Sequence, residues 1–375
     1  MSGARHLYVH LPFCAARCGY CDFVTVVGRE SRHGEYVDAL IAELELERGA
    51  LSERLDTVFL GGGTPTFTEA GSLRRLLRAL PDCEELTVEA NPETVTPELA
   101  LLLAAEGVTR VSLGAQSFQP HLLQKLERRA SPDVVRRAFE RLRAAGFDNV
   151  SLDLIYGIPG QSTIDLERDI DEALALAPEH LSWYELEAKP GTRFTHAHGD
   201  ELARQAEEME DYFERVVDGM TRAGYRWYET ANFCLMSERG GDRDLRSRHN
   251  LGYWLGRDYL GLGIGAVSTV GARRWRNAPR LGAYIEALAH GQHPLREVED
   301  LTAEVKREER VMLGLRLDEG VLLTDAAEAI DTHALDRLVA ADLVRVGPAN
   351  GAPPALRLTG RGRRLGDGVT AELLL

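Results

Sequence analysis

The sequence predicts an α/β protein: an open, partial (β/α) barrel followed by a small winged-helix-like domain. Three observations lead to this prediction. Short apolar, β-branched runs alternate with segments of helical spacing through residues 7–186. Polar motifs follow the ends of these runs. After residue 300, three helical segments precede two short strand-like runs. Alternation of this kind is typical of parallel βαβ units, whose ligands gather at the carboxyl ends of the strands.

Six strands are expected in the barrel, and each is followed by a helical segment. The strands are predicted at residues 7–11, 57–60, 86–90, 109–114, 149–157 and 180–186. Helical spacing is clear between them, for example at 72–80 and 132–146. Six units are too few for a closed eight-stranded barrel, so we expect an open one with its ligands at one rim.

The rest of the chain divides into a barrel-closing region and a small domain. One amphipathic helix is expected over 201–222, with its apolar face on the core. A charged loop at 237–248 precedes an aromatic, glycine-rich run at 249–268. We expect three domains: the partial barrel 1–230, a closing and linking region 231–300, and a winged-helix-like domain 301–375. In the last, the expected elements are helices 302–314, 325–330 and 333–341 and a wing of VRVG and ALRLT.

Composition excludes some classes of partner and favours one cellular compartment. The chain has 375 residues and a formal net charge of −15, which argues against nucleic-acid binding. No apolar run approaches the length of a membrane span, and the N-terminus lacks the features of a secretory signal. Two of the five cysteines, Cys83 and Cys234, stand alone and are expected to be buried. An odd number of cysteines in a chain of this length favours the reducing cytoplasm.

A cluster of three cysteines follows the first predicted strand with the spacing C-x3-C-x2-C. Its members are Cys14, Cys18 and Cys21. Three thiolates can ligate three irons of a 4Fe–4S cluster and leave the fourth iron open. S-adenosylmethionine can chelate that iron, and reductive cleavage then releases a 5′-deoxyadenosyl radical. The alternative is a zinc site completed by His6 or His10, although zinc sites usually have two CxxC pairs.

Other polar motifs are expected at the same rim as the cysteines. Gly61–Pro65 follows the second strand, where glycines allow close approach of the backbone to a ligand. Four further side chains lie at or just beyond strand ends: Glu89, Gln116, Arg128 and Asp153. Each alone is typical of a capping or solvated residue. Together they suit the amino, carboxylate and hydroxyl groups of an adenosyl ligand.

These motifs resemble those of a known family. In order along the chain they are YVHLPFCAARCGYCDF, FLGGGTPT, VEANPET, VSLGAQSF, LDLIYGIPGQS, LSWYELEAKPGTRF, RHNLGYW, DYLGLGIGAVS and MLGLRLDEGV. They resemble the radical S-adenosylmethionine (radical SAM) proteins related to oxygen-independent coproporphyrinogen III oxidase. The resemblance implies a six-stranded partial (β/α) radical SAM barrel with a helical C-terminal domain.

Three details make the chain more similar to the heme chaperone branch, the HemW family, than to the oxidase. The oxidase has a fourth cysteine where this chain has Phe23, and it has an extension before the first strand. The heme chaperones carry H-N-x-x-Y-W, present here from His249 to Trp254. The resemblance therefore implies heme binding, an electron donor for the cluster, and transfer of heme to a hemoprotein acceptor at the membrane. The alternative is a radical enzyme acting on a porphyrinogen, or a related methyltransferase.

The resemblance also implies roles for individual residues. The cluster would be ligated by the three clustered cysteines. The bound S-adenosylmethionine would contact Tyr8, Gly62 and Glu89. Positions that hold a second such molecule in the oxidase are matched by Tyr20, Gly63, Thr64, Gln116, Arg128 and Asp153. One departure is Glu127, which replaces the glycine that often precedes the arginine in this family.

The heme site is predicted around His249, Tyr253 and Trp254. Imidazole is a good axial ligand for heme iron, and the two aromatic side chains could flank a porphyrin face. The alternative is a structural histidine among aromatic side chains that pack the barrel mouth. Oxidation of coproporphyrinogen III is not expected from this chain.

Overall fold

The computed structural model describes residues 3–189, 193–236, 243–348 and 353–374. The six predicted strands form a parallel arc in the order of the chain, with β1 next to β2 and so on to β6. Their bounds are β1 His6–Leu11, β2 Leu55–Gly62, β3 Cys83–Ala90, β4 Arg110–Gln116, β5 Val150–Tyr156 and β6 His180–Glu185. The predicted open (β/α) barrel is thereby confirmed.

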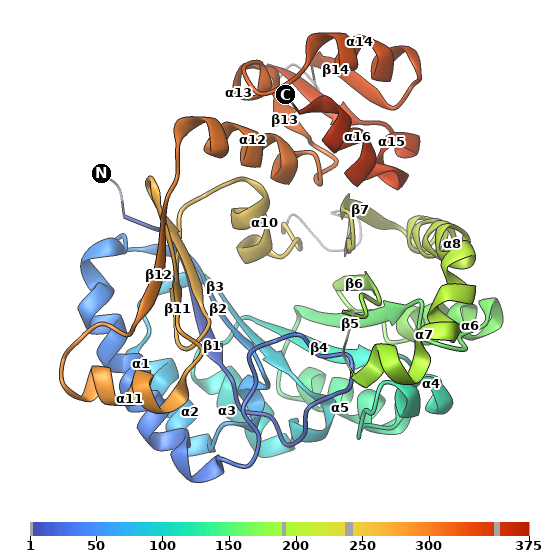
Figure 1. The fold of residues 1–375 in the computed structure, drawn as a ribbon. Coiled ribbons are helices and arrows are strands. Elements are labelled where there is room, and N and C mark those ends of the chain that lie inside the picture. The colour runs from blue at the N-terminus through green and yellow to red at the C-terminus, as the bar shows by residue number, and fades with distance from the viewer. Residues whose placement is uncertain (1–2, 190–192, 237–242, 349–352, 375) are drawn as a thin grey trace.

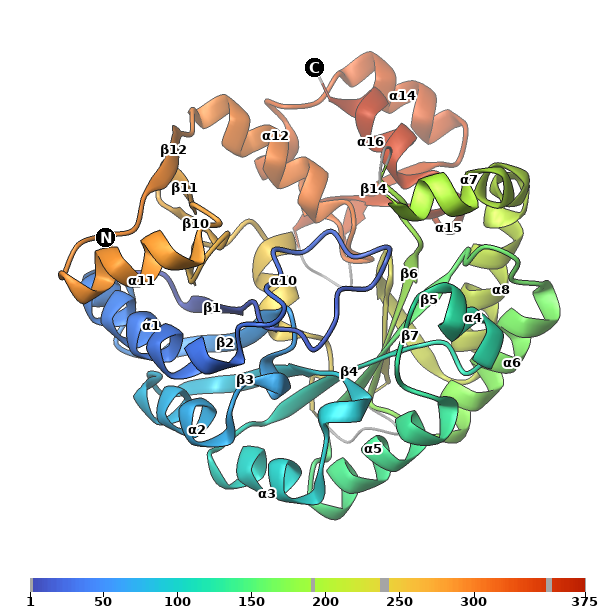
Figure 2. The ribbon, with the colours of Figure 1, turned by 60° about the horizontal axis from the view of Figure 1, so that its bottom comes forward.

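Helices cover the outer face of this arc (Figure 2). They are α1 His33–Glu47, α2 Ala70–Ala79, α3 Pro97–Ala105, α4 Pro120–Lys125, α5 Pro132–Ala144 and α6 Thr163–Ala175. In α5, buried side chains recur at helical spacing, namely Val135, Ala138, Phe139 and Leu142. Helix α6 begins at a capping box of Ser162 and Asp165. The core lies between the helices and the strands.

The sheet continues beyond the arc at both ends, so it has twelve strands. Next to β1 lies β9 in parallel, followed by three antiparallel strands. Beyond β6 lie β8 and β7, also antiparallel. The bounds are β7 Tyr225–Glu229, β8 Asn232–Leu235, β9 Tyr259–Leu262, β10 Val267–Val270, β11 Arg273–Asn277 and β12 Arg296–Asp300. Sequence patterns did not predict these strands, because each has only four or five residues.

The prediction of one helix over 201–222 is wrong. The segment is split into α7 (Arg193–Gln205), a 3-10 turn (Ala206–Glu208) and α8 (Met209–Arg222). Continuous α-helix would stack like charges three and four residues apart in the acidic run 207–211, which disfavours it. The hydroxyl of Tyr212 donates to the carbonyl of Gln161, which ties the second helix to the barrel. The charged loop predicted at 237–248 lies partly outside the described residues.

Two elements follow β8 and β11 and connect the barrel to the C-terminal part. Helix α10 (Arg248–Trp254) carries the H-N-x-x-Y-W motif, and α11 (Leu281–Ala289) packs against α1. The loop after β1 carries the cysteines and passes across the mouth of the arc (Figure 2). Within the described residues, no helix is long and apolar enough to span a membrane.

The C-terminal part lies over the barrel and has its own hydrophobic core (Figure 1). Its elements are α12 Ala303–Gly314, β13 Val321–Leu322, α13 Leu323–Ala326, α14 Thr332–Ala340, β14 Val344–Pro348, β15 Pro354–Leu358, α15 Gly360–Arg364 and α16 Gly366–Leu373. Strands β14 and β15 form the predicted antiparallel wing. The part is joined to β7 by a bidentate ion pair between Arg226 and Asp318 at 2.8 and 2.9 Å. The domain boundaries themselves stay a prediction.

Candidate functional site

A pocket of about 350 Å³ opens at the carboxyl ends of the parallel strands. Most of the residues predicted from the sequence line it. They are Cys14, Cys18, Tyr20, Cys21, Gly62, Gly63, Thr64, Glu89, Gln116, Arg128 and Asp153. The pocket is hereafter called the cysteine pocket. Its residues come from the five strands β2 to β6, from the cysteine loop and, for Arg128, from the segment after α4. They meet because the carboxyl ends of parallel strands lie at one rim.

The cysteine loop is anchored to the barrel at its base. The amide of Cys14 donates to the carbonyl of Val26, and the amide of Val26 donates to the carbonyl of Pro12. The sulfur of Cys14 lies 3.4 Å from the hydroxyl oxygen of Thr64. Burial raises the pKa of the Cys14 and Cys21 thiols, so these groups are protonated when no metal is present. Binding of iron would displace these protons.

The triple glycine after β2 lets the backbone approach the cysteine loop. Gly62 has φ of +111°, and a Cβ atom there would lie 2.4 Å from the His10 ring. A Cβ atom on Gly63 would lie 2.5 Å from the carbonyl oxygen of Pro12 and 3.0 Å from the sulfur of Cys14. Any larger residue would therefore push the loop away from β2.

Two carboxyl groups are buried at the floor of the pocket. Glu89 accepts a hydrogen bond from the amide of Gly62 at 3.0 Å, and Asp153 accepts from the hydroxyl of Ser112 at 2.9 Å. Burial, and then the nearby Asp153, raise the pKa of Glu89 to about 8. Burial also raises the pKa of Asp153, while Arg110 lowers it. Such groups are poised to become ionised when a cationic ligand enters.

Arg128 connects the far wall of the pocket to the cysteine loop. It donates to the side-chain oxygen of Asn91 at 2.9 Å and to the carbonyl of Gly114 at 3.0 Å, and it lies 3.8 Å from the sulfur of Cys18. The preceding residue, Glu127, has φ of +56°, which is the left-handed conformation that favours glycine. The glycine found there in the family is thus explained by the backbone.

Sequence reasoning missed several residues of this pocket, among them Asn91 and Ser112. Asn91 donates to the hydroxyl of Thr64 at 2.9 Å while it accepts from Arg128, so it links two walls. Ser112 orients the carboxyl of Asp153. Both could have been found, because Asn91 follows the end of β3 directly and Ser112 faces the same side of β4 as Gly114.

Tyr8 departs from its predicted place. Its side chain lines a second, larger cavity, and its hydroxyl is 3.0 Å from Nδ1 of His10. The two cavities share Asp22 and Phe23 at the end of the cysteine loop. Phe23 is 65% exposed there. Tyr8 therefore lies behind the cysteine pocket and does not line it.

Of the predicted heme residues, Tyr253 and Trp254 line the second cavity, whereas His249 does not. His249 is only 1% exposed, and both of its ring nitrogens are occupied. Nδ1 lies 2.7 Å from the hydroxyl of Thr57, and Nε2 lies 2.8 Å from the hydroxyl of Tyr253. Burial lowers the pKa of His249 to about 3. In this structure the ring supports the barrel mouth, and iron ligation by His249 stays a prediction that requires the ring to move.

The cysteine pocket is suited to a cluster of several irons. Among the described residues, no three His, Cys, Asp or Glu side chains converge on the position of a single ion. Cluster ligands bind different irons and need not converge. The two histidines proposed for the zinc alternative are held elsewhere, with His6 on Thr57 at 2.8 Å and His10 on the carbonyl of Val24 at 2.8 Å.

Comparison with known proteins agrees with this site. A model of the radical SAM superfamily matches residues 8–173. The chain is 38% identical to heme chaperone HemW of Mycobacterium tuberculosis over 98% of this chain and 94% of that protein. It is 36% identical to heme chaperone HemW of Bacillus subtilis over 99% of each. It is 35% identical to heme chaperone HemW of Escherichia coli over 70% of each.

A solved structure shows the same fold. The chain aligns with coproporphyrinogen III oxidase (HemN) of Escherichia coli with a TM-score of 0.79 over 99% of this chain and 90% of that chain. The sequence identity to it is 22%, so this likeness concerns the fold alone. The sequence relatives, the matched superfamily model and the cysteine pocket agree, and the chain belongs to the HemW family of the radical SAM superfamily.

Proposed function

We propose that this protein is a heme chaperone with a radical SAM fold, which binds heme and passes it to hemoproteins. The observation that carries the proposal is its identity of 36 to 38% to heme chaperones over at least 98% of the chain. The acceptor would be a hemoprotein at the membrane, and an electron donor would serve the cluster. The thiol cluster and the absence of a spanning helix in the described residues support a place in the cytoplasm.

The cysteine pocket would hold the 4Fe–4S cluster and S-adenosylmethionine. The three cysteines of the loop would ligate the cluster. Gly62 and Gly63 would bring backbone groups against the ligand, and Glu89 and Asp153 would accept hydrogen bonds from its ammonium and hydroxyl groups. When bound, the cluster and S-adenosylmethionine supply an organic radical. Use of the second S-adenosylmethionine site stays open.

The competing function is oxidation of coproporphyrinogen III by a radical mechanism. Phe23 lines the pocket at the position of the oxidase's fourth cysteine, so this position supplies no thiol. We therefore expect no conversion of coproporphyrinogen III to protoporphyrinogen IX by the purified protein, even with reductant and S-adenosylmethionine present.

One purification tests the proposal. The protein is isolated without oxygen, and iron, sulfide and heme are measured on the same sample after heme loading. We expect cluster iron and sulfide, about one heme per chain, and transfer of that heme to an apo-hemoprotein. Sustained turnover of coproporphyrinogen III without heme binding would instead establish the oxidase alternative.

A further inference from the structure

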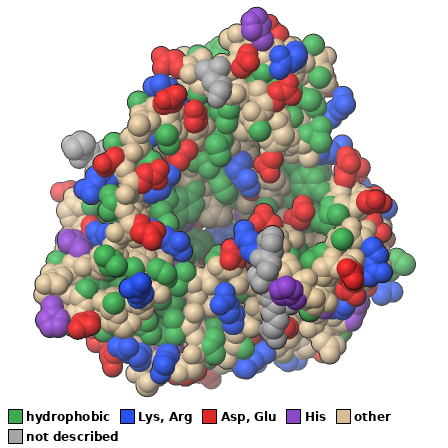
Figure 3. All heavy atoms as spheres, viewed as in Figure 1, with side chains coloured by type: hydrophobic (Ala, Val, Ile, Leu, Met, Phe, Trp, Pro, Cys, Tyr) green, Lys and Arg blue, Asp and Glu red, His purple; other side chains and the backbone are tan. Residues whose placement is uncertain are grey.

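The largest cavity described above has about 950 Å³ and lies between the barrel and the C-terminal part. One side is the sheet face of β1, β9, β10 and β11, and the other is helix α12. Figure 3 shows the molecule hollowed between these two parts, with hydrophobic side chains inside the hollow. The volume is in the range of sites that enclose a large organic ligand. We call it the interdomain cavity.

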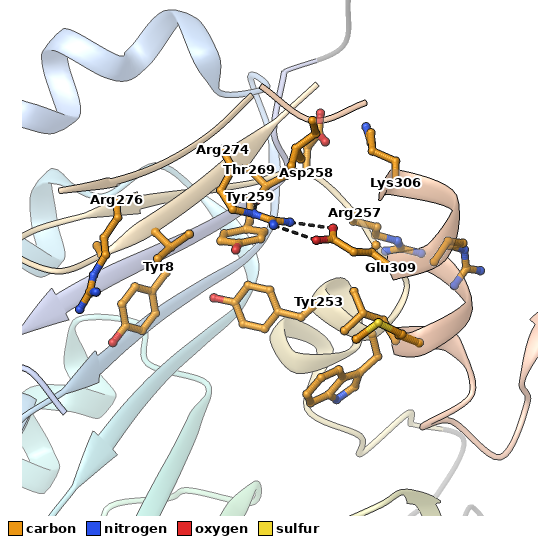
Figure 4. Close-up of a pocket in the computed structure, with 18 of the residues that line it drawn as sticks. Tyr8, Tyr253, Arg257, Asp258, Tyr259, Thr269, Arg274, Arg276, Lys306 and Glu309 are labelled. Atoms are coloured by element: carbon orange, nitrogen blue, oxygen red, sulfur yellow. Dashed lines mark hydrogen bonds and ion pairs between the residues drawn. The ribbon is translucent and has the colours of Figure 1, made fainter. Parts of the chain in front are cut away.

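The sheet side of the interdomain cavity is aromatic. Tyr8 and Tyr259 come from the neighbouring parallel strands β1 and β9. Tyr253 of α10 meets Tyr259 edge-on with ring centroids 4.6 Å apart (Figure 4). His249 holds the Tyr253 hydroxyl from behind at 2.8 Å and is thus a positioning residue for this wall. Aromatic walls of this kind offer both ring faces and ring edges to an aromatic ligand.

The helix side of the cavity carries two weakly paired cations, of which Lys306 forms no ion pair to a described residue and Arg310 forms only a long one. Lys306 and Arg310 are one turn apart on α12, so their side chains share one face. Lys306 donates to the carbonyl of Gly271 at 2.7 Å and forms no ion pair within the described residues. The Nη1 atom of Arg310 is buried without a hydrogen-bond partner, and the nearest carboxylate contact of the side chain, to Asp325, is 3.9 Å long. A buried unsatisfied donor at a cavity wall calls for an acceptor.

Another cation lies on the opposite wall. Arg276 of β11 lines the cavity and takes part in no ion pair to a described residue. By contrast its neighbour on the same face, Arg274, forms a bidentate pair with Glu309 at 2.8 and 2.7 Å (Figure 4). Six basic and five acidic residues line the cavity, although the whole chain has a net charge of −15. The cavity lining therefore has an excess of one basic side chain in a chain that is acidic overall.

We propose that the interdomain cavity is the site where this protein holds heme, with the macrocycle against Tyr8, Tyr253 and Tyr259 and the propionates drawn to Arg276, Lys306 and Arg310. The proposal rests on the proposed function and adds the place of the ligand. A planar apolar ring that carries two carboxylates matches an aromatic wall with weakly paired cations beside it.

Charge variants on both walls test the placement. Heme titrations followed by the Soret band, at fixed ionic strength, compare the wild type with Arg276→Glu and with the double variant Lys306→Glu/Arg310→Glu. We expect heme binding about tenfold weaker for the first and about 100-fold weaker for the second, since each removes charge-assisted contacts. Arg273→Glu is the matched control, because Arg273 lies on the same strand but outside the cavity, and it should change affinity less than about twofold.

A second ligand and a steric variant keep the test decisive. Iron-free protoporphyrin IX should show the same losses, whereas its dimethyl ester, which lacks the carboxylates, should be insensitive to the charge variants. Thr269→Trp should block the cavity and abolish binding of all three. Cluster iron and thermal melting report whether each variant is folded. Wild-type heme affinity in every folded cavity variant would overturn the placement while the chaperone function stands. Absence of heme binding in the wild type would overturn the proposed function itself.

Discussion

The two cavities of this protein lie back to back and have opposite chemistry. The cysteine pocket is lined by two basic and five acidic side chains, and the interdomain cavity by six basic and five acidic ones. S-adenosylmethionine carries a sulfonium and an ammonium group, whereas heme carries two carboxylates. The difference predicts that a single loop, which ends at Asp22 and Phe23, separates a site for a cation from a site for an anion.

The largest effect is expected when the cluster is removed, which tests whether the two cavities act independently. Cys14→Ser, Cys18→Ser and Cys21→Ser should each lose nearly all iron and sulfide, because a cluster with two thiolate ligands is not retained. Heme affinity should stay near that of the wild type, since no cysteine lines the interdomain cavity. Iron, sulfide and Soret titrations measured on one preparation check both statements.

The control variants for this test are Cys83→Ser and Cys234→Ser. Both thiols lie outside the cysteine pocket, and burial raises the pKa of Cys83 to about 11 and that of Cys234 to about 12. Full cluster content is expected in both. Normal iron and sulfide in Cys18→Ser would contradict the assignment of the loop.

The next largest effect is expected at Glu89. This residue lines the cysteine pocket and not the interdomain cavity, so its substitution should affect only the cationic ligand. Glu89→Gln should weaken S-adenosylmethionine binding about 10- to 100-fold, because a charge-assisted hydrogen bond is lost, and should leave heme binding unchanged. Isothermal titration with each ligand measures both. In the wild type, S-adenosylmethionine should bind more tightly as the pH rises toward 8, since the carboxyl must lose its proton to pair with a cation.

The same residue gives a pH dependence of stability with a definite sign. The pKa of Glu89 is about 8 in the folded protein and that of an ordinary glutamate about 4.5. Between these values the folded state keeps a proton that the unfolded chain has lost. The free energy of unfolding should therefore fall as the pH rises through this window. Urea unfolding at pH 6 and pH 8 should show a smaller fall for Glu89→Gln, and an equal fall would contradict the assignment.

A smaller effect, on stability, is expected at His249. His249→Ala removes a buried ring and leaves the hydroxyls of Thr57 and Tyr253 without partners, so unfolding should become easier by about 3 kcal/mol. Heme affinity should fall together with thermal stability. The Soret spectrum and the melting curve of one sample decide the role of the ring. A shifted Soret band with an unchanged melting temperature would show that His249 ligates iron.

The smallest effect concerns the backbone behind Arg128. Glu127 has φ of +56°, so Glu127→Gly should relieve strain that Glu127→Ala retains. The glycine variant should be more stable than the alanine variant by about 1 kcal/mol. Denaturant melts of the two variants measure this difference, and equal stability would show that the strain is absent. Neither change should affect the interdomain cavity.

The sequence alone determined the arc of strands and nearly all of the cysteine pocket. Parallel strands end at one rim, so each polar motif after a strand could be placed there without any knowledge of side-chain packing. Asn91 and Ser112 fell under the same rule and were missed only because they looked like ordinary capping or strand residues. The prediction of a single long helix at 201–222 was wrong because the helical spacing of apolar residues continues across the short 3-10 turn.

Only the tertiary structure shows where the side chains of Tyr8 and His249 lie, and only it shows the interdomain cavity. Side chains alternate between the two faces of a strand. Tyr8 lies beside Tyr259 in the cavity wall only because β1 pairs with β9, which lies some 250 residues later in the chain. The ring of His249 contacts Thr57, 192 residues away, and that contact holds the ring behind the cavity lining in this structure. The cavity has walls from residue 8 to residue 328. No local pattern encodes it, because it exists only where helix α12 lies over the sheet.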